Sequence, residues 1–595
     1  MTYGKREKVI FSSKNPKLFW SYVNNRSKND LGIRSVKVSD VEISDGQVMT
    51  NIFNDYFTSV FSAKRDISIP DNNHTLPSPA LDSISVSAIE VIDVLKKLPP
   101  KIATDGDGLC YKVLKEGGVI LASILSDLFS LSLRTSQVPS AWKIAIVKPI
   151  HKKGSRNDVG NYRPISITSS CCRVMERIVR YKINNFLLVN SLLSDSQHGF
   201  MRGRSTDTIL LSFYDFITSE MDSNKIVDAI FFDFAKAFDK IPHDLLISRL
   251  FEHRICGSLL KWLGSFLSDR YQKVTIRNYS SKLLPVSSGI VQGSVLGPTL
   301  FSIFIDNIDK SLEYCSILKY ADDIRIYLSS LKNNESLSEL RYKIQCDIDN
   351  VFAWSEASGM KFNIDKCFHT TFGHCSLEST RVYHIDHDII NSSSCFGDLG
   401  VTISTPLSFN NHMDRVVNKG FQKLGLIQKI FQDRSPKSIL RLYTSFIRPT
   451  LEYSSLLWNP YSIGYISKME RVQRRMCRIL PCVRHLGYKD QVKTLGLLSL
   501  RARRLRFQLI TMYRIYKNFV DINFSNFFNI SKSCRTRGHN AKVDTKHAKN
   551  NYRLNFFTVS AISLWNRLPQ ELIDAPTVNN FKIGLVSFFT REDIW

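Results

Sequence analysis

A chain of 595 residues is too long for a single hydrophobic core, so it is expected to divide into several domains. Its apolar fraction of 43%, with 37 Phe and 22 Tyr, excludes a disordered chain. The formal net charge of +26 indicates a polyanionic partner such as a nucleic acid.

The sequence shows no export or membrane signal. The N-terminus lacks the apolar core of a signal peptide, and the best membrane-span candidate, residues 119–133, is interrupted by four serines and an aspartate. The 12 cysteines contain no Cys-x-x-Cys, which is typical of reduced intracellular thiols. Two groups of residues could suggest a zinc site: Cys477, Cys482 and His485, and Cys534, His539 and His547. A zinc site is not favoured, because neither group supplies four ligands at the usual spacing. The sequence therefore predicts a protein of the cytoplasm and nucleus with no membrane contact.

In chain order, residues 1–85 predict a helical N-terminal extension and residues 86–130 a helical lead-in. Strands are expected at 145–149 and 163–168, on either side of a basic loop, and a short buried strand at 228–234. A glycine-containing loop from Gly289 leads into a helix with Pro298 in its first turn. Beyond about residue 405 the pattern is strongly helical.

Two adjacent carboxylates, Asp322 and Asp323, follow one apolar run and precede another, where a strand pair must turn. Asp233 lies at the end of the buried strand upstream and offers a third carboxylate. Three carboxylates on neighbouring strand ends suit two hard divalent cations. Tyr-Ala-Asp-Asp alone could equally be an ordinary turn, because Asp favours turn positions.

The C-terminal third carries most of the positive charge. Between Lys468 and Arg553 there are 21 Lys and Arg against four acidic residues. Four arginines are spaced i, i+3, i+4, i+7, which places them on one helical face: Arg471, Arg474, Arg475 and Arg478. The sequence predicts that a polyanion crosses this region, with a solvated basic face as the alternative.

A series of motifs follows in a fixed order along the chain, at 147–154 with 161–168, 197–206, 232–243, 289–301, 320–323 and 359–366. This series resembles the reverse transcriptases of jockey-like, LINE-type retrotransposons without long terminal repeats. Residues 397–401, Gly-Asp-Leu-Gly-Val, depart from the family pattern because Asp398 stands where an aromatic is usual, a change expected to affect packing rather than chemistry. Residues 15–61 and 565–569 extend the resemblance to both flanks.

The resemblance implies an α+β right-hand polymerase: fingers, a palm with an antiparallel sheet, and a helical thumb, with helical extensions at both ends. The implied domains are the extension 1–85, the lead-in 86–130, the reverse transcriptase domain 131–404, a basic helical thumb 405–530 and a C-terminal extension 531–595. Too few residues precede the lead-in for the endonuclease of full-length relatives, so this chain is expected to lack it.

The resemblance also implies a catalytic site. Asp233 and Asp322 would ligate two Mg²⁺ ions, with Mn²⁺ as a substitute, Asp323 would contribute to one of them, and the Phe234 carbonyl would supply a further oxygen. The alternative for Asp323 is a turn-forming residue that only tunes the site. Asp239 is expected to be structural.

Other implied residues would bind the nucleotide. Lys152 and Arg163 would grip the triphosphate, with Lys148 and Lys153 competing with Lys152 for this role. Phe238 would exclude a ribose 2′-hydroxyl, with a core aromatic as its alternative. Gln292 and Gly293 would lie near the incoming nucleotide, and Lys366 would protonate the pyrophosphate.

Basic residues are expected to contact nucleic acid backbones without reading sequence. Arg202 and Arg204 would meet template phosphates. The duplex or RNA would run along Arg471, Arg474, Arg475, Arg478, Arg501, Arg504 and Arg506.

The expected function is RNA-directed DNA polymerisation, with an RNA template, deoxynucleoside triphosphates and a 3′-hydroxyl primer on nicked target DNA, in a ribonucleoprotein. One alternative is an inactive retrotransposon relict that acts only as a basic RNA-binding protein. The other, an RNA-dependent RNA polymerase, is disfavoured by Phe238. The sequence does not fix the oligomeric state.

Overall fold

A six-stranded sheet lies at the centre of the chain, with the strand order β12-β13-β11-β5-β10-β9. All of its pairings are antiparallel except that of β11 with β13. The strands are β5 (Val227–Phe232), β9 (Ser316–Tyr320), β10 (Asp323–Ser329), β11 (Phe368–Phe372), β12 (Tyr383–Ile385) and β13 (Asp388–Ser392). The computed structural model describes residue 7 and residues 16–27, 32–69, 78–330, 337–373, 382–531 and 538–594.

Strand β5 is buried on both faces, and its side chains alternate between two hydrophobic cores. Ala229 and Phe231 face the core that contains α8, whereas Ile230 and Phe232 face the core on the opposite side of the sheet. This second core is covered by α7 (Ser170–Val189), α10 (His243–Glu252), α12 (Gly297–Ile305) and α13 (Leu337–Ala357), and the first by α8 (Thr206–Asp222). The palm sheet is therefore a middle layer between two sets of helices.

A second sheet, with the order β4-β3-β6-β7 and β8 paired to β6, forms the fingers. Its strands are β3 (Ile144–His151), β4 (Tyr162–Ile167), β6 (Arg270–Ile276), β7 (Tyr279–Ser280) and β8 (Leu284–Val286). The helices beside it are α4 (Ala88–Lys97), α5 (Tyr111–Glu116), α6 (Gly118–Thr135), α9 (Ala237–Lys240) and α11 (Gly257–Leu267).

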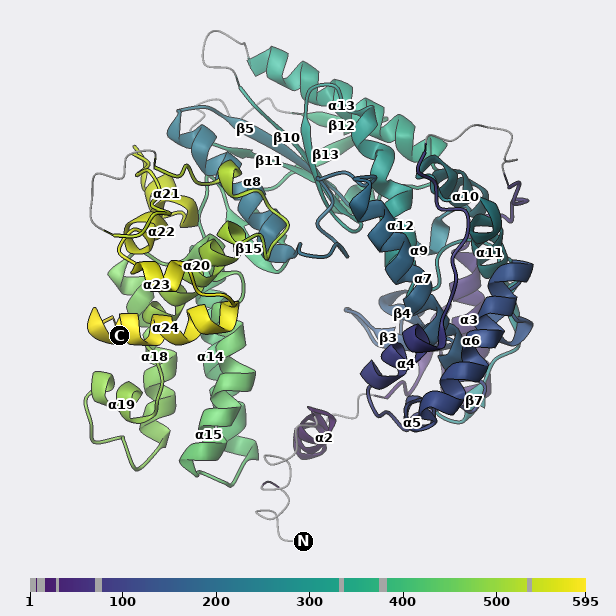
Figure 1. Ribbon diagram of the computed structural model, residues 1–595, viewed down its shortest axis with the longest axis horizontal. Helices are drawn as coiled ribbons and strands as arrows, with labels where there is room; N and C mark the ends of the chain where they lie inside the picture. The colour runs from purple at the N-terminus through teal and green to yellow at the C-terminus, as the bar shows by residue number, and fades with distance from the viewer. Residues whose placement is uncertain are drawn as a thin grey trace.

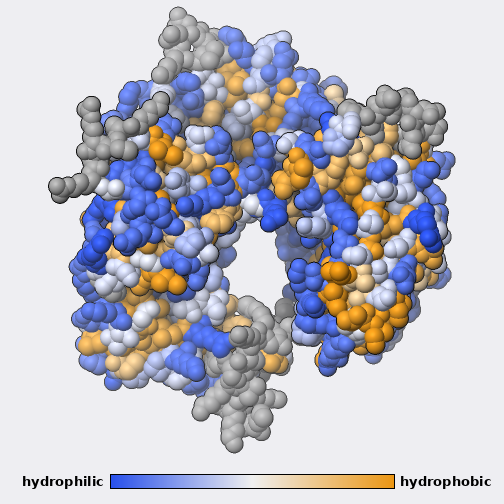
Figure 2. All heavy atoms as spheres, viewed as in Figure 1, coloured by the Kyte–Doolittle hydropathy of each residue, from blue (hydrophilic) through white to orange (hydrophobic). Residues whose placement is uncertain are grey.

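Among the described residues, α6 is the one helix long and apolar enough to cross a membrane, and it packs on α4 and α11 of the fingers. Its outer face keeps several large apolar side chains exposed, including Val119, Ile120 and Ile124. Figure 2 shows apolar surface over this part of the molecule.

The N-terminal residues depart from the expected all-helical extension. A short hairpin, β1 (Val36–Val38) with β2 (Val41–Ile43), precedes α3 (Gly46–Ser59), which packs on the fingers strand β6. Helix α2 (Pro16–Ser27) instead contacts the thumb, where the Phe19 ring stacks on Phe431 with their centroids 5.7 Å apart. The extension is thus divided between two lobes. The Asp-, Asn-, Ser- and Pro-containing composition of residues 66–79 predicts a linker, part of which lies outside the described residues.

The C-terminal third is helical, as expected, after a hairpin of β14 (Cys395–Asp398) and β15 (Val401–Ser404). Its helices are α14 (Asn410–Ile430), α15 (Pro436–Leu442), α16 (Arg448–Glu452), α17 (Ser455–Trp458), α18 (Ile463–Ile479), α19 (Tyr488–Thr494), α20 (Leu500–Tyr516), α21 (Asn551–Leu554), α22 (Phe557–Trp565), α23 (Gln570–Ile573) and α24 (Val578–Arg591). The described residues on both sides of the expected boundary at 530 contribute to one hydrophobic core, which they share with α8 of the palm.

The fingers and the helical C-terminal third flank the palm sheet on opposite sides (Figure 1). Figure 2 shows a central opening between them. The mixed helices and antiparallel sheets confirm the α+β class, and the three lobes confirm the expected right-hand plan.

Candidate active site

The strand register brings the three predicted carboxylates to one end of the palm sheet. Strand β10 pairs with β5 so that Ile324 lies opposite Phe232, which leaves Asp323 and Asp233 each one residue beyond this pair, at the same end of the two strands. Residues directly opposite in antiparallel strands have Cα atoms roughly 5 Å apart. The β9–β10 hairpin closes from Tyr320 to Asp323, which leaves Asp322 in the two-residue turn.

Burial and neighbouring carboxylates raise the pKa of Asp322 and Asp323. Burial raises the pKa of Asp322, and Asp233 raises it further, against the opposing effect of Arg163 and Lys152. Asp323 keeps an exposed surface, but the surrounding protein displaces much of the water near its carboxylate. This desolvation raises the pKa of Asp323 to about 6, and the charge of Asp322 adds to the shift. Three such carboxylates at one strand end are a donor set that fits hard cations.

Asp233 has a cationic partner within the protein. The Nζ of Lys366 lies 2.6 Å from Oδ2 of Asp233. Backbone bonds from Asn363 N to Asp233 O, at 2.7 Å, and from Ala235 N to Lys361 O, at 2.8 Å, hold the Lys366 segment beside the strand end. As the side chains stand, no group of three His, Cys, Asp or Glu in the described ranges is gathered to hold a metal ion. Ligation by Asp233 would require it to exchange Lys366 for the ion.

The same two backbone bonds flank Phe234, which forms an isolated antiparallel bridge with Phe362. They use the Asp233 carbonyl and the Ala235 amide. The Phe234 carbonyl, the predicted further ligand, therefore points out of this ladder, and its role as a ligand stays a prediction.

Two basic residues of the fingers face the carboxylates. Arg163 lies on β4, Lys152 directly follows β3, and both are exposed. Desolvation lowers the pKa of Lys152, followed by the positive charges of Arg163 and Lys366, while Asp233 opposes the shift. The structure thus brings Lys152, Arg163 and Lys366 into electrostatic contact with the aspartates. Lys153 also lies near Lys152, so the choice between them stays open.

Phe238 lies on α9, a few residues after Asp233, and is half-buried. Its ring stacks on Phe301 of α12 with a centroid separation of 4.3 Å and meets the edge of Phe200 at 6.4 Å. The ring is therefore held in place from two sides and keeps a partly open surface.

The 289–293 loop is bound to the protein at its two predicted nucleotide contacts. The Gln292 side chain donates to Oδ1 of buried Asp239 at 2.7 Å, and the Gln292 backbone carbonyl accepts from Ser166 N at 2.8 Å. A Cβ at Gly293, whose φ is +119°, would lie 2.5 Å from the Ser166 carbonyl oxygen. The close backbone approach that requires glycine is thus to the fingers strand β4. Burial raises the pKa of Asp239.

The basic stripe on α18 has the predicted geometry. All four arginines are exposed on one face, and the opposite face is buried through Met469, Val472 and Met476: the stripe is Arg471, Arg474, Arg475 and Arg478. Arg501 at the start of α20 and Arg202 in the 197–206 loop are also exposed.

Three other arginines are not placed as expected. Arg504 is 2% exposed, and its Nε donates to Asn459 Oδ1 at 2.9 Å. Arg506 is half-buried and donates to the Lys582 carbonyl. Arg204 pairs with Asp195 at 2.7 Å and Asp521 at 2.8 Å, so it ties the 197–206 loop to the C-terminal third. Phosphate contacts by these three stay predictions that this conformation does not favour, because protein acceptors already bind part of each guanidinium group.

The sequence contained a sign of a buried ion pair beside the site, the acidic residue Asp398, but its partner was not identified. Asp398, the departure from the family pattern, forms a buried ion pair with Arg325, two residues after Asp323 on β10. The unusual acid was interpretable only with its partner, which lies 73 positions away.

A family model described as reverse transcriptase (RNA-dependent DNA polymerase) matches residues 150–427. The chain is 27% identical over 424 residues to the probable RNA-directed DNA polymerase from transposon BS of Drosophila melanogaster, covering 68% of this chain and 46% of that protein. It is also 27% identical over 420 residues to the RNA-directed DNA polymerase from mobile element jockey of the same organism, covering 68% and 45%.

The chain thus spans about half the length of these curated relatives. Among solved structures, an apo telomerase from Candida tropicalis, truncated from its C-terminal domain, aligns with a TM-score of 0.32 and 14% identity, covering 48% of this chain and 60% of that chain.

Proposed function

We propose that the chain, which is similar to the reverse transcriptases of jockey-like retrotransposons without long terminal repeats, is an RNA-directed DNA polymerase that extends a primer 3′-hydroxyl on an RNA template. The observation that carries this proposal is the register of β10 with β5, which brings Asp233 and Asp323 to the same end of the two strands, with Asp322 in the adjoining turn and Lys152 and Arg163 within electrostatic range.

Asp233, Asp322 and Asp323 would hold two Mg²⁺ ions, with the Phe234 carbonyl as a further oxygen donor. Bound there, the ions would activate the attacking hydroxyl and neutralise the leaving pyrophosphate. Burial, followed by the charge of neighbouring carboxylates, raises the pKa of Asp322 and Asp323, and this supports the role because a bound cation would offset the repulsion between the carboxylates.

Different basic residues would bind different parts of the substrates. Arg163 and Lys152 would bind the triphosphate, because a guanidinium and an ammonium supply several donors to phosphate oxygens. In this structure the Lys366 ammonium pairs with Asp233. In the reaction it would leave Asp233, contact the pyrophosphate and donate a proton to it. The exposed arginines of α18, together with Arg501, would track the duplex backbone.

Phe238 would select the sugar. Its ring is fixed by the Phe301 stack and leaves no freedom to move away from a ribose 2′-hydroxyl. Gln292 and Gly293 would support this selection indirectly, by fixing the loop between α9 and β4.

The test is extension of a DNA primer on an RNA template with deoxynucleotides and Mg²⁺. Extension is expected, and it is expected to continue when the primer is the 3′-hydroxyl of a nicked DNA duplex. No extension would refute the proposal, and salt-sensitive RNA binding without extension would favour an RNA-binding relict. Preferential use of ribonucleotides would favour an RNA-dependent RNA polymerase instead.

A further inference from the structure

The loop at 194–199 covers the edge of the palm sheet that lies next to the carboxylates. Strand β9 is the outermost strand of the sheet. Gln197 forms a parallel bridge with Lys319 of β9, in which His198 N donates to Lys319 O at 2.8 Å and Lys319 N donates to Ser196 O at 2.9 Å. The loop therefore runs along β9 toward the turn that contains Asp322.

The Gln197 side chain reaches that turn directly. Its Oε1 accepts hydrogen bonds from Gly199 N at 2.7 Å and from Ala321 N at 3.1 Å. Gln197 is fully buried. Ala321 adopts a left-handed backbone with a φ of +57°, which is uncommon for a residue with a side chain. A Cβ at Gly199 would lie 2.3 Å from Ala321 N, so only glycine permits this approach.

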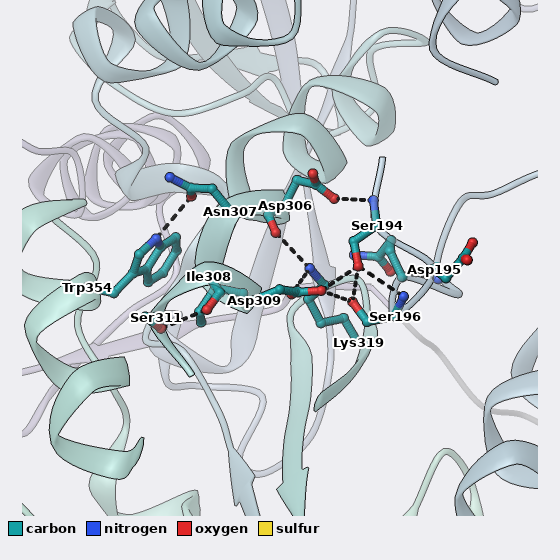
Figure 3. A network of polar contacts seen from close by, with 12 residues as sticks. Ser194, Asp195, Ser196, Asp306, Asn307, Ile308, Asp309, Ser311, Lys319 and Trp354 are labelled. Carbon is teal, nitrogen blue, oxygen red and sulfur yellow. Dashed lines mark hydrogen bonds and ion pairs between the residues drawn. The ribbon is translucent and has the colours of Figure 1, made fainter. Parts of the chain in front are cut away.

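A buried polar network fixes the loop from behind (Figure 3). Lys319 is fully buried, its Nζ pairs with Asp309, and it also donates to the Asp306 carbonyl at 3.0 Å. Asp309 accepts hydrogen bonds from Ser194 Oγ and, at 2.6 Å, from Ser196 Oγ. A hydrogen bond from the Ser194 backbone N to the side-chain Oδ1 of Asp306, at 2.9 Å, completes the attachment. The loop thus has few ways to move relative to the sheet.

We infer that Gln197 is a positioning residue that holds the Ala321–Asp322 turn in its left-handed form and so aims Asp322 and Asp323. The inference rests on the proposed function, because the reason to aim the carboxylates is ion-assisted nucleotide addition. The family resemblance implies that the 197–206 loop contacts the template. The role inferred for Gln197, at the start of this loop, is different, because its side chain contacts the protein's own turn at Ala321.

Two measurements on the full chain test this role through Gln197→Met, which keeps the side-chain length but removes the acceptor. The first is hydrogen–deuterium exchange resolved to single amides. Exchange at Ala321 and Gly199 is expected to rise roughly 10- to 100-fold, because their N–H groups lose a buried partner. Exchange within the β10–β5 ladder is expected to stay unchanged.

The second measurement is single-turnover nucleotide addition. The maximal rate of Gln197→Met is expected to fall at least about 10-fold, with the dissociation constant for primer–template within about 2-fold of wild type. Adding Ala321→Gly is expected to recover part of this rate, since glycine takes the left-handed conformation without steric cost.

The matched control is Gln491→Met on α19, which likewise removes a buried amide, one that donates to Val483 O at 3.1 Å. An equal loss of rate in this variant, or unchanged exchange at Ala321 in Gln197→Met, would overturn the inference. An inactive wild type would overturn the proposed function alone, and the exchange at Ala321 would still decide on Gln197.

Discussion

The buried ion pair of Arg325 with Asp398 offers a quantitative test of how the catalytic strand is held. The Arg325 Nη1 lies 2.5 Å from Asp398 Oδ2, and Nη2 lies 2.9 Å from Oδ1. Both residues are at least 96% buried, and the Tyr214 hydroxyl also donates to Asp398. The guanidinium lies over the rings of Phe213 and Phe231, 4.9 and 5.3 Å from their centroids. The pair joins β10 to β14.

Arg325→Met would leave the Asp398 carboxylate buried without its charge partner. Breaking one side of a buried pair costs about 3–5 kcal/mol. The double variant Arg325→Met/Asp398→Phe replaces the pair with apolar groups and restores the aromatic usual in the family. It is expected to recover most of this loss, because apolar replacement of a whole buried pair is often neutral or stabilising.

The assay is hydrogen exchange of the β10 amides at residues 324–328, which reports the free energy of opening of this strand. In the single variant the exchange should accelerate by roughly 10²- to 10⁴-fold, since each 1.4 kcal/mol is about a factor of ten. Lys489→Met, which breaks the exposed pair with Asp593, should leave β10 unchanged. Equal acceleration in the single and double variants would refute the reasoning, as would a single variant that exchanges like wild type.

Three further predictions concern the substrate contacts. Phe238→Ala should lower the preference for deoxynucleotides over ribonucleotides at least about 10-fold in competition assays, and an unchanged preference would remove its role as a sugar filter. Gly293→Ala should destabilise the protein by about 1–3 kcal/mol in thermal unfolding, because its Cβ meets the Ser166 carbonyl, whereas Gly425→Ala on the open face of α14 should not destabilise it. The magnitude of the slope of log affinity for an RNA–DNA duplex against log salt should fall by about 3.6 when four arginines become glutamine, and an unchanged slope would exclude them from the interface: Arg471, Arg474, Arg475 and Arg478.

Local sequence patterns were sufficient where one element decides the outcome. The apolar runs around Asp322 predicted the β9–β10 hairpin, and the spacing of the α18 arginines predicted their shared exposed face. Pro298 in the first turn predicted the start of α12. In each case the period of the side chains, or the conformation of one residue, fixes the local structure.

Features that depend on packing between distant segments could not be predicted in the same way. Arg504 follows the same basic pattern as Arg501, but α20 packs against α18, α22 and α24, which bury it. The contact of Gln197 with Ala321 joins residues 124 positions apart. Strand β6 was not predicted because it is defined by its pairing with β3, 127 positions upstream, and because its sequence, Arg-Tyr-Gln-Lys-Val-Thr-Ile, begins with polar residues.

The most direct measurement of the central claim is the single-turnover rate at which one deoxynucleotide is added to a DNA primer on an RNA template with Mg²⁺. The account predicts addition by wild type, a loss of at least about 100-fold in Asp322→Asn, and a rate within about 2-fold of wild type for Asp93→Asn, an exposed carboxylate on α4. Equal rates in wild type and Asp322→Asn would contradict it.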